Sequence, residues 1–240
     1  MSEASSPPGA GLGTALRWLL AGSVLVLVVL YVLGYAFLSR SDLVLELPTR
    51  GEVGWLGPMR LEGSRVLWVP WLLAQSAGIV WLVWQHRATT NLWERRYPGL
   101  RVSPGWAVGW WFVPIANLWM PFVAMRELDR RSTTDGVPRP AGGVLGWWWA
   151  AWLCRGIVPT IGISVSLAGR LWDWIRAIPE DATSVDVTTI ANAVAPWLLV
   201  AAAFEAVAAA LAIAVVARID AAQRALAGAA PPAPQRPDAG

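Results

Sequence analysis

The stretch RWLLAGSVLVLVVLYVLGYAFLSR, Arg17 to Arg40, holds 22 uncharged residues between two arginines. A helix rises about 1.5 Å per residue, so about 20 apolar residues span the hydrocarbon core of a bilayer. This stretch therefore predicts a membrane-spanning helix over residues 16–38. Further uncharged or nearly uncharged runs predict helices over 66–92, 105–128, 144–168 and 194–218. The expected fold class is all-α, a polytopic transmembrane helix bundle.

The composition agrees with a chain dissolved in lipid. Of its 240 residues, 56% are hydrophobic and 15% are charged, whereas soluble domains carry about 25% charged residues. Eighteen of its aromatic residues are Trp, a residue type that gathers at membrane–water interfaces. These features exclude a soluble single-core domain. Residues 1–14 and 227–240 are expected to be disordered tails around a membrane domain over 15–226.

The third run differs from the others because Pro114, Asn117 and Pro121 lie inside it. Prolines remove backbone hydrogen bonds that lipid cannot replace. We therefore expect four crossings plus a Pro-broken re-entrant or interfacial segment, with five crossings as the alternative. Four crossings put 12 arginines on the cytoplasmic side and 6 outside, and the better five-crossing arrangement gives 11 and 7. The positive-inside rule then predicts cytoplasmic N- and C-termini.

The segment from Pro98 to Leu128 is the most distinctive in the chain, and its sequence is PGLRVSPGWAVGWWFVPIANLWMPFVAMREL. Together with the preceding helix it supplies the candidate motif residues: Arg87, Asn91, Gly105, Gly109, Trp110, Trp111, Pro114, Asn117, Pro121, Arg126 and Glu127. Gly105 and Gly109 form a GxxxG pair, a pattern that permits close helix approach. One hypothesis is a re-entrant loop whose Asn117 lines a polar cavity, and the other is an interfacial hairpin that packs the mouth of the bundle. Arg87 and Asn91 belong either to a solvated helix face or to a contact that docks onto Asn117.

This motif closely resembles a bacterial membrane family known only as domain of unknown function 4328. The resemblance rests on Arg87 and Asn91, Pro104-Gly105-Trp106, the block from Gly109 to Pro114, Asn117, Pro121 and the Met125–Leu128 end. It extends from about Val66 to the region of Gln223. It implies a multi-pass membrane protein of the bacterial inner membrane, and it supplies no activity and no catalytic residues.

Two charges, Arg155 and Glu205, lie inside apolar runs. Arg155 is 11 residues from Val144, and Glu205 is 11 residues from Val216, the expected cytoplasmic ends of their apolar runs. This places both about 16 Å deep. A lone charge near the bilayer centre costs about 2.5–3.5 kcal/mol on insertion scales. We therefore predict an intramembrane ion pair between them. It is either a static pair that sets helix register or part of an ion, proton or substrate pathway.

The remaining residues give no pattern for enzyme chemistry. Cys154 and His86 are each the only residue of their type, and a metal site needs several converging ligands. We expect no enzyme activity and no catalytic, cofactor-binding or metal-binding residues. The lipid bilayer is the expected partner, with another membrane protein or a second copy of the chain as further candidates. Nucleic acid is excluded because the sequence contains no basic helix. The predicted function is a membrane scaffold or regulatory module with Arg-rich cytoplasmic segments; the alternative is a small transporter or channel subunit using Arg155 and Glu205.

Overall fold

The computed structural model describes residues 10–39, 44–46, 64–95, 99–132, 143–179 and 184–228. They form two compact units. Unit 1 comprises residues 1–22, 73–150 and 209–240, and unit 2 comprises residues 23–72 and 151–208. The elements in chain order are α1 (Ala10–Leu38), β1 (Val44–Glu46), α2 (Ser64–Glu94), α3 (Pro104–Gly109), η1 (Trp110–Phe112), η2 (Ala116–Leu118), α4 (Met120–Arg131), α5 (Gly143–Ala168), α6 (Arg170–Ala177), β2 (Ser184–Asp186) and α7 (Thr188–Gly228).

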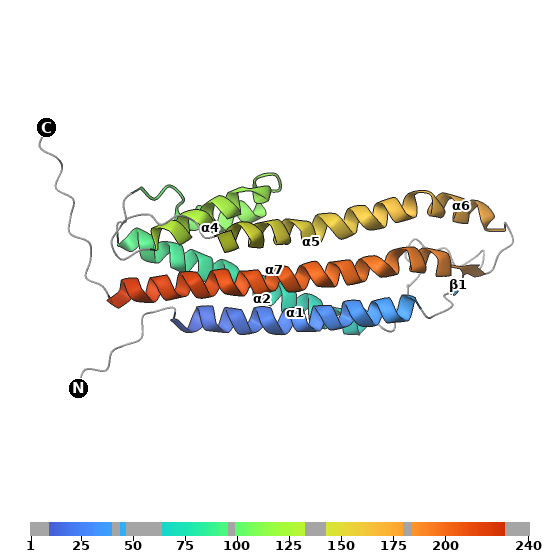
Figure 1. Ribbon diagram of the computed structural model, residues 1–240, viewed down its shortest axis with the longest axis horizontal. Coiled ribbons are helices and arrows are strands. Elements are labelled where there is room, and N and C mark those ends of the chain that lie inside the picture. Colours follow the sequence, from blue (N-terminus) through green and yellow to red (C-terminus); the bar gives the residue numbers. More distant parts are fainter. Residues whose placement is uncertain are drawn as a thin grey trace, which may run out of the picture. The chain divides into compact units, whose positions relative to one another are not determined.

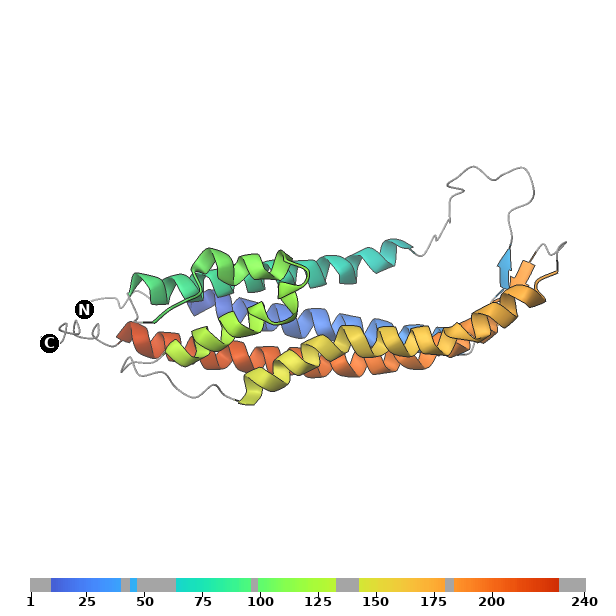
Figure 2. The ribbon, with the colours of Figure 1, turned by 90° about the horizontal axis from the view of Figure 1, so that it is seen from above.

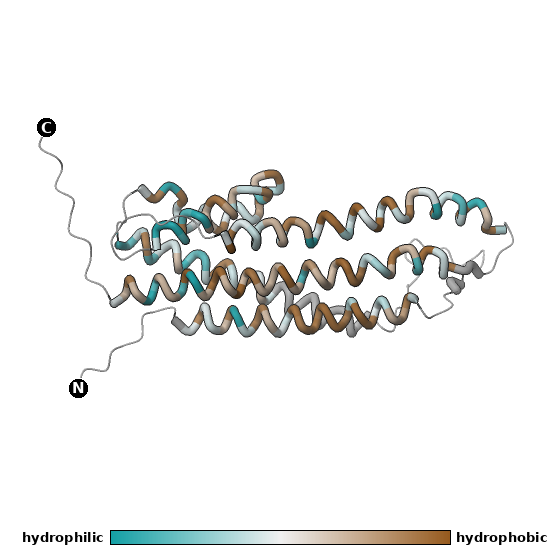
Figure 3. The backbone as a smooth tube through the Cα atoms, in the orientation of Figure 1, coloured by the Kyte–Doolittle hydropathy of each residue, from teal (hydrophilic) through white to brown (hydrophobic). Residues whose placement is uncertain are grey.

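Helices dominate the described chain, as the apolar runs predict (Figure 1). Within that part, three helices are long and apolar enough to cross a membrane: Gly11–Leu38, Gly143–Ala168 and Thr188–Gly228. Figure 3 shows the long hydrophobic stretches along them. These helices support a membrane protein, although they do not confirm four crossings.

α7 is the element whose length differs most from expectation, since it begins six residues before 194 and ends ten residues after 218. Its 41 residues extend about 60 Å, roughly twice the hydrocarbon thickness of about 30 Å. The apolar run ends at Ala217, and the polar continuation from Arg218 onward is rich in Ala, Arg, Leu and Gln, all good helix formers. A helix can therefore extend beyond the apolar run from which it is predicted.

The expected tails need a correction where the structure describes them. α1 begins at Ala10 and α7 extends to Gly228, so residues 10–14 and 227–228 are helical instead of disordered. Tertiary packing stabilises both extensions, since Gly13 lies against Asp220 and Leu226 is buried. Residues 1–9 and 229–240 lie outside the described residues.

In unit 1, the third run folds back instead of forming one helix. Ser103 caps α3, its hydroxyl accepting from the Trp106 amide, and Pro104 occupies the first turn, where a missing N–H costs nothing. Val113 is extended, as the residue before a proline prefers, and this interrupts the helix ahead of Pro114. α4 then runs back along α3, so that Glu127 reaches the start of the segment. We call residues 99–132 the fold-back segment.

In unit 2, parts of α1, α5 and α7 run side by side (Figures 1 and 2). Gly162 faces the Trp197 ring, and the Trp197 indole donates to the Ser166 hydroxyl at 2.9 Å. β1 and β2 form an antiparallel pair in which Val44 lies opposite Asp186. The all-α expectation missed this pair because strands of three residues are too short to show an alternating pattern.

Candidate functional site

Gln85 on α2 holds the fold-back segment of unit 1. Its side chain is fully buried. The amide nitrogen donates to the Ala107 carbonyl at 3.1 Å, and the amide oxygen accepts from the Trp111 indole at 2.9 Å. A buried amide without partners is costly, so these bonds fix the segment against α2. Gln85 is not among the residues predicted from the sequence, although a polar residue inside an uncharged run is a signal that could identify it.

Glu127 joins the two ends of the fold-back segment. Its carboxylate accepts from the backbone amides of Arg101 at 2.6 Å and Val102 at 3.2 Å. The Trp93 indole donates to the Val102 carbonyl at 3.0 Å, which fastens the start of the segment to α2. A continuous helix would separate residues 101 and 127 by about 39 Å, so these bonds require the chain to turn back.

Tryptophan rings fill the space between α2, the fold-back segment and the start of α5 in unit 1. Trp81 stacks on Trp148 with ring centroids 5.1 Å apart, and Trp111 meets Trp149 edge-on at 6.1 Å. Trp81, Trp84, Trp148 and Trp149 are all buried. Aromatic pairs of this kind add about 0.5–1.5 kcal/mol beyond their burial, so Trp111 is a packing residue of this unit.

A second polar network in unit 1 links α2, α4 and α7. The Asn91 amide donates to the Gln223 side-chain oxygen at 3.0 Å, and the Gln223 amide donates to the Ala88 carbonyl and the Ser132 hydroxyl, each at 3.2 Å. Asp129, almost fully buried, pairs with Arg218 at 2.7 Å. These contacts tie the fold-back segment to α7.

Asp220 connects α7 to α1 and α2. Its carboxylate accepts from the Trp84 indole at 2.9 Å and lies against Gly13. Asp220 follows the apolar run of α7, which ends at Ala217. Burial raises the pKa of this carboxyl, and the Trp84 hydrogen bond and nearby Arg17 and Arg224 act in the opposite direction.

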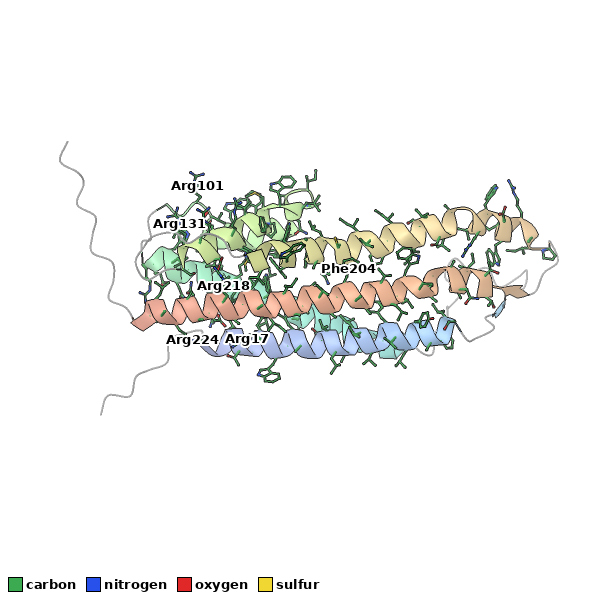
Figure 4. The ribbon with its side chains drawn as sticks, in the orientation of Figure 1. Arg17, Arg101, Arg131, Phe204, Arg218 and Arg224 are labelled. Carbon is green, nitrogen blue, oxygen red and sulfur yellow. The ribbon has the colours of Figure 1, made fainter. Side chains whose placement is uncertain are left out.

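These residues surround a cleft of about 220 Å³ at the ends of α1, α2 and α7 in unit 1. Three arginines line it, Arg87, Arg95 and Arg224, together with the acidic residues Glu94 and Asp220. Figure 4 labels Arg224 and the neighbouring Arg17, both of which act electrostatically on Asp220. We call this the arginine cleft.

Comparison with known proteins places the chain in a family. Residues 62–221 match the family described as a domain of unknown function, DUF4328. The chain belongs to this family. No curated protein and no solved structure matches it. The DUF4328 region contains the fold-back segment, Gln85 and Asp220, whereas Gly13 precedes it and Gln223 and Arg224 follow it.

Several expectations for the motif need correction. Asn91 contacts Gln223 rather than Asn117, because α2 presents that face to α7. The GxxxG pair does not pack against another helix: a Cβ at Gly105 would meet nothing within 4 Å, and one at Gly109 would meet only the Trp106 ring. α3 is six residues long, too short to offer a continuous helix face.

The remaining motif residues of this DUF4328 member differ in exposure and in their contacts within unit 1. Pro114 is exposed and Pro121 is fully buried. The buried side-chain oxygen of Asn117 has no hydrogen-bond partner among the described residues. Trp110 stacks on Trp106 at 4.5 Å, and the Arg126 guanidinium lies 5.7 Å from the centre of the Phe122 ring. No group of three or more His, Cys, Asp or Glu that could hold a metal occurs in the described part of the chain.

Arg155 and Glu205, also within the DUF4328 region, form an ion pair in unit 2. One Arg155 nitrogen lies 3.0 Å and 2.9 Å from the two Glu205 carboxylate oxygens. The guanidinium also lies 5.5 Å from the centre of the Trp152 ring. Arg155 is residue 13 of the 26 in α5, so the pair sits half-way along that helix. The structure therefore brings together the two charges whose pairing is predicted from their equal depth.

The contact between Gly13 and Asp220 gives a first prediction. A methyl group at Gly13 would collide with the Asp220 carboxylate, whereas one at Gly11 would meet nothing within 4 Å. Replacing Gly by Ala in a helix normally stabilises it by up to about 1 kcal/mol. We expect Gly11→Ala to raise and Gly13→Ala to lower the free energy of unfolding in detergent, with a difference of about 1–2 kcal/mol. Equal effects of the two substitutions would contradict this packing.

Proposed function

We propose that the chain is a non-enzymatic multi-pass protein of the bacterial inner membrane. It acts as a scaffold or regulatory module through the arginine-rich end of unit 1, which lies in the cytoplasm. α1, α2, α5 and α7 cross the membrane, and the fold-back segment enters from the cytoplasmic side without crossing. Both termini are then cytoplasmic.

The excess of arginine over acidic residues in unit 1 is the observation that carries this proposal. Unit 1 takes its segments from three separate parts of the chain. Its described residues include nine arginines: Arg17, Arg87, Arg95, Arg101, Arg126, Arg130, Arg131, Arg218 and Arg224. They include only four acidic residues: Glu94, Glu127, Asp129 and Asp220. Arginines gather on the cytoplasmic side of membrane proteins, and the stretches 40–65 and 169–186, expected outside, belong to unit 2.

The fold-back segment supports entry without crossing. Its ends meet at Glu127, so both lie on the same side of the bilayer. Val102 contacts Trp93, whereas Trp111 contacts Gln85, eight residues or about 12 Å further along α2. The turn between them exposes large apolar side chains: Phe112, Ile115, Leu118 and Trp119. Such a surface suits lipid better than water.

The polar contacts favour a structural over a transport role. Arg155 bonds to both oxygens of Glu205, so each intramembrane charge neutralises the other. In unit 1, Gln85 and Glu127 bind parts of the same fold. Polar groups that bond to other parts of the same chain stabilise the fold, and a scaffold requires a stable fold.

Cysteine labelling of intact cells tests the proposed topology on a Cys154→Ser background. We expect Arg101→Cys and Arg130→Cys to be protected from a membrane-impermeant maleimide until the cells are opened, because both exposed positions face the cytoplasm. Asp173→Cys, exposed in unit 2, is expected to label in intact cells. Labelling of residues 101 and 130 from opposite sides would establish five crossings and overturn the proposal.

A further inference from the structure

The arginine cleft combines positive charge with an apolar floor. Leu12, half-buried, and Ala227, exposed, line it, and the Arg87 and Arg224 side chains are exposed. Its volume of about 220 Å³ is several times the roughly 30 Å³ that a water molecule occupies in the liquid. A cleft of this kind accepts a ligand with an anionic group and an apolar part.

The arginines that line the cleft outnumber its acidic residues by three to two. One oxygen of the Asp220 carboxylate accepts from Trp84, and the other is buried without a hydrogen-bond partner among the described residues. Glu94 is the one further acid in the lining. Within the described residues, no salt bridge engages Arg87 or Arg95. Guanidinium groups in this state bind phosphate oxygens through paired, charge-assisted hydrogen bonds.

The cleft also lies at the level where the apolar runs end. Arg87 follows the uncharged run of α2, and Asp220 follows the run of α7. Trp84 marks the same level on α2, and Trp is typical of the membrane–water interface. Phospholipid headgroups occupy this depth, and basic pockets between transmembrane helices bind them.

We propose that the arginine cleft binds the phosphate group of an anionic phospholipid headgroup. Arg87, Arg95 and Arg224 contact the phosphate, and Leu12 and Ala227 contact the glycerol and first acyl carbons. A soluble phosphate ester would present the same anionic chemistry without the apolar contacts. The inference rests on the proposed function, since it requires this end of unit 1 to lie at the interface.

Calorimetric titration of the full-length protein in a neutral detergent tests the cleft. The probes are dihexanoyl phosphatidic acid, dihexanoyl phosphatidylcholine and glycerol 3-phosphate. We expect phosphatidic acid to bind at least roughly tenfold more tightly than either of the others. The Arg87→Gln/Arg224→Gln variant should lose at least about tenfold in affinity, and Arg87→Lys/Arg224→Lys should lose less because the charge remains.

The control variant, Arg101→Gln/Arg126→Gln, removes the same charge from exposed positions of unit 1 outside the cleft. It should bind phosphatidic acid within about twofold of the unchanged protein. Equal losses in the two glutamine variants, or no measurable binding, would overturn the proposal. Equally tight binding of glycerol 3-phosphate would assign the cleft to a soluble ester instead. Cysteine labelling that places residue 101 outside would overturn the proposed function, while the titration would still report on the cleft.

Discussion

Reversing either charge of the Arg155–Glu205 pair is expected to lower the free energy of unfolding by about 2.5–3.5 kcal/mol. Arg155→Glu leaves two carboxylates facing each other, and Glu205→Arg leaves two guanidinium groups. In either case an uncompensated charge stays half-way along an apolar helix. Unfolding of the purified protein by sodium dodecyl sulfate, followed by circular dichroism, measures the change.

The exchange variant Arg155→Glu/Glu205→Arg separates the two roles considered for the pair. Where the pair sets helix register, exchange restores most of the stability, because opposite charges again meet between α5 and α7. A double variant no more stable than the single reversals would show that the contact itself is not what stabilises unit 2. The neutral variant Arg155→Gln/Glu205→Gln should fall between the single reversals and the unchanged protein, since it leaves no buried charge.

The long helices could be predicted from the sequence because each membrane-length run carries its own signal. An uncharged stretch of about 20 residues needs no partner to be recognised. Pro114 and Pro121 likewise reveal a broken helix locally, since each removes a hydrogen-bond donor. Arg155 and Glu205 could be paired because depth in the membrane is a common scale for residues far apart in sequence.

The polar network of unit 1 could not be predicted in this way. Trp84 and Asp220 are 136 residues apart in sequence, and Asn91 and Gln223 are 132 apart. These residues are not isolated charges inside apolar runs, so equal depth in the membrane could not be used to pair them, as it was for Arg155 and Glu205. Which face of α2 meets α7 depends on side-chain packing among tryptophans, and the sequence pattern does not encode that rotation. The arginine cleft is a product of this packing, so it was visible only in the folded chain.

Gly162→Ala is expected to destabilise unit 2 by about 1–3 kcal/mol, the usual cost of overpacking a close contact. A Cβ at this position would overlap the Trp197 ring. The ring cannot turn aside without losing the hydrogen bond from its indole to Ser166, at 2.9 Å. The same unfolding measurement in sodium dodecyl sulfate reports the change.

Gly156 provides the matched control, since it belongs to the same helix and a Cβ there would meet nothing within 4 Å. Gly156→Ala should leave the free energy of unfolding unchanged or raise it by up to about 1 kcal/mol. In a Trp197→Ala background, Gly162→Ala should cost much less, because the obstructing ring is gone. Equal costs of Gly162→Ala in the two backgrounds would mean that Trp197 does not occupy the space beside Gly162.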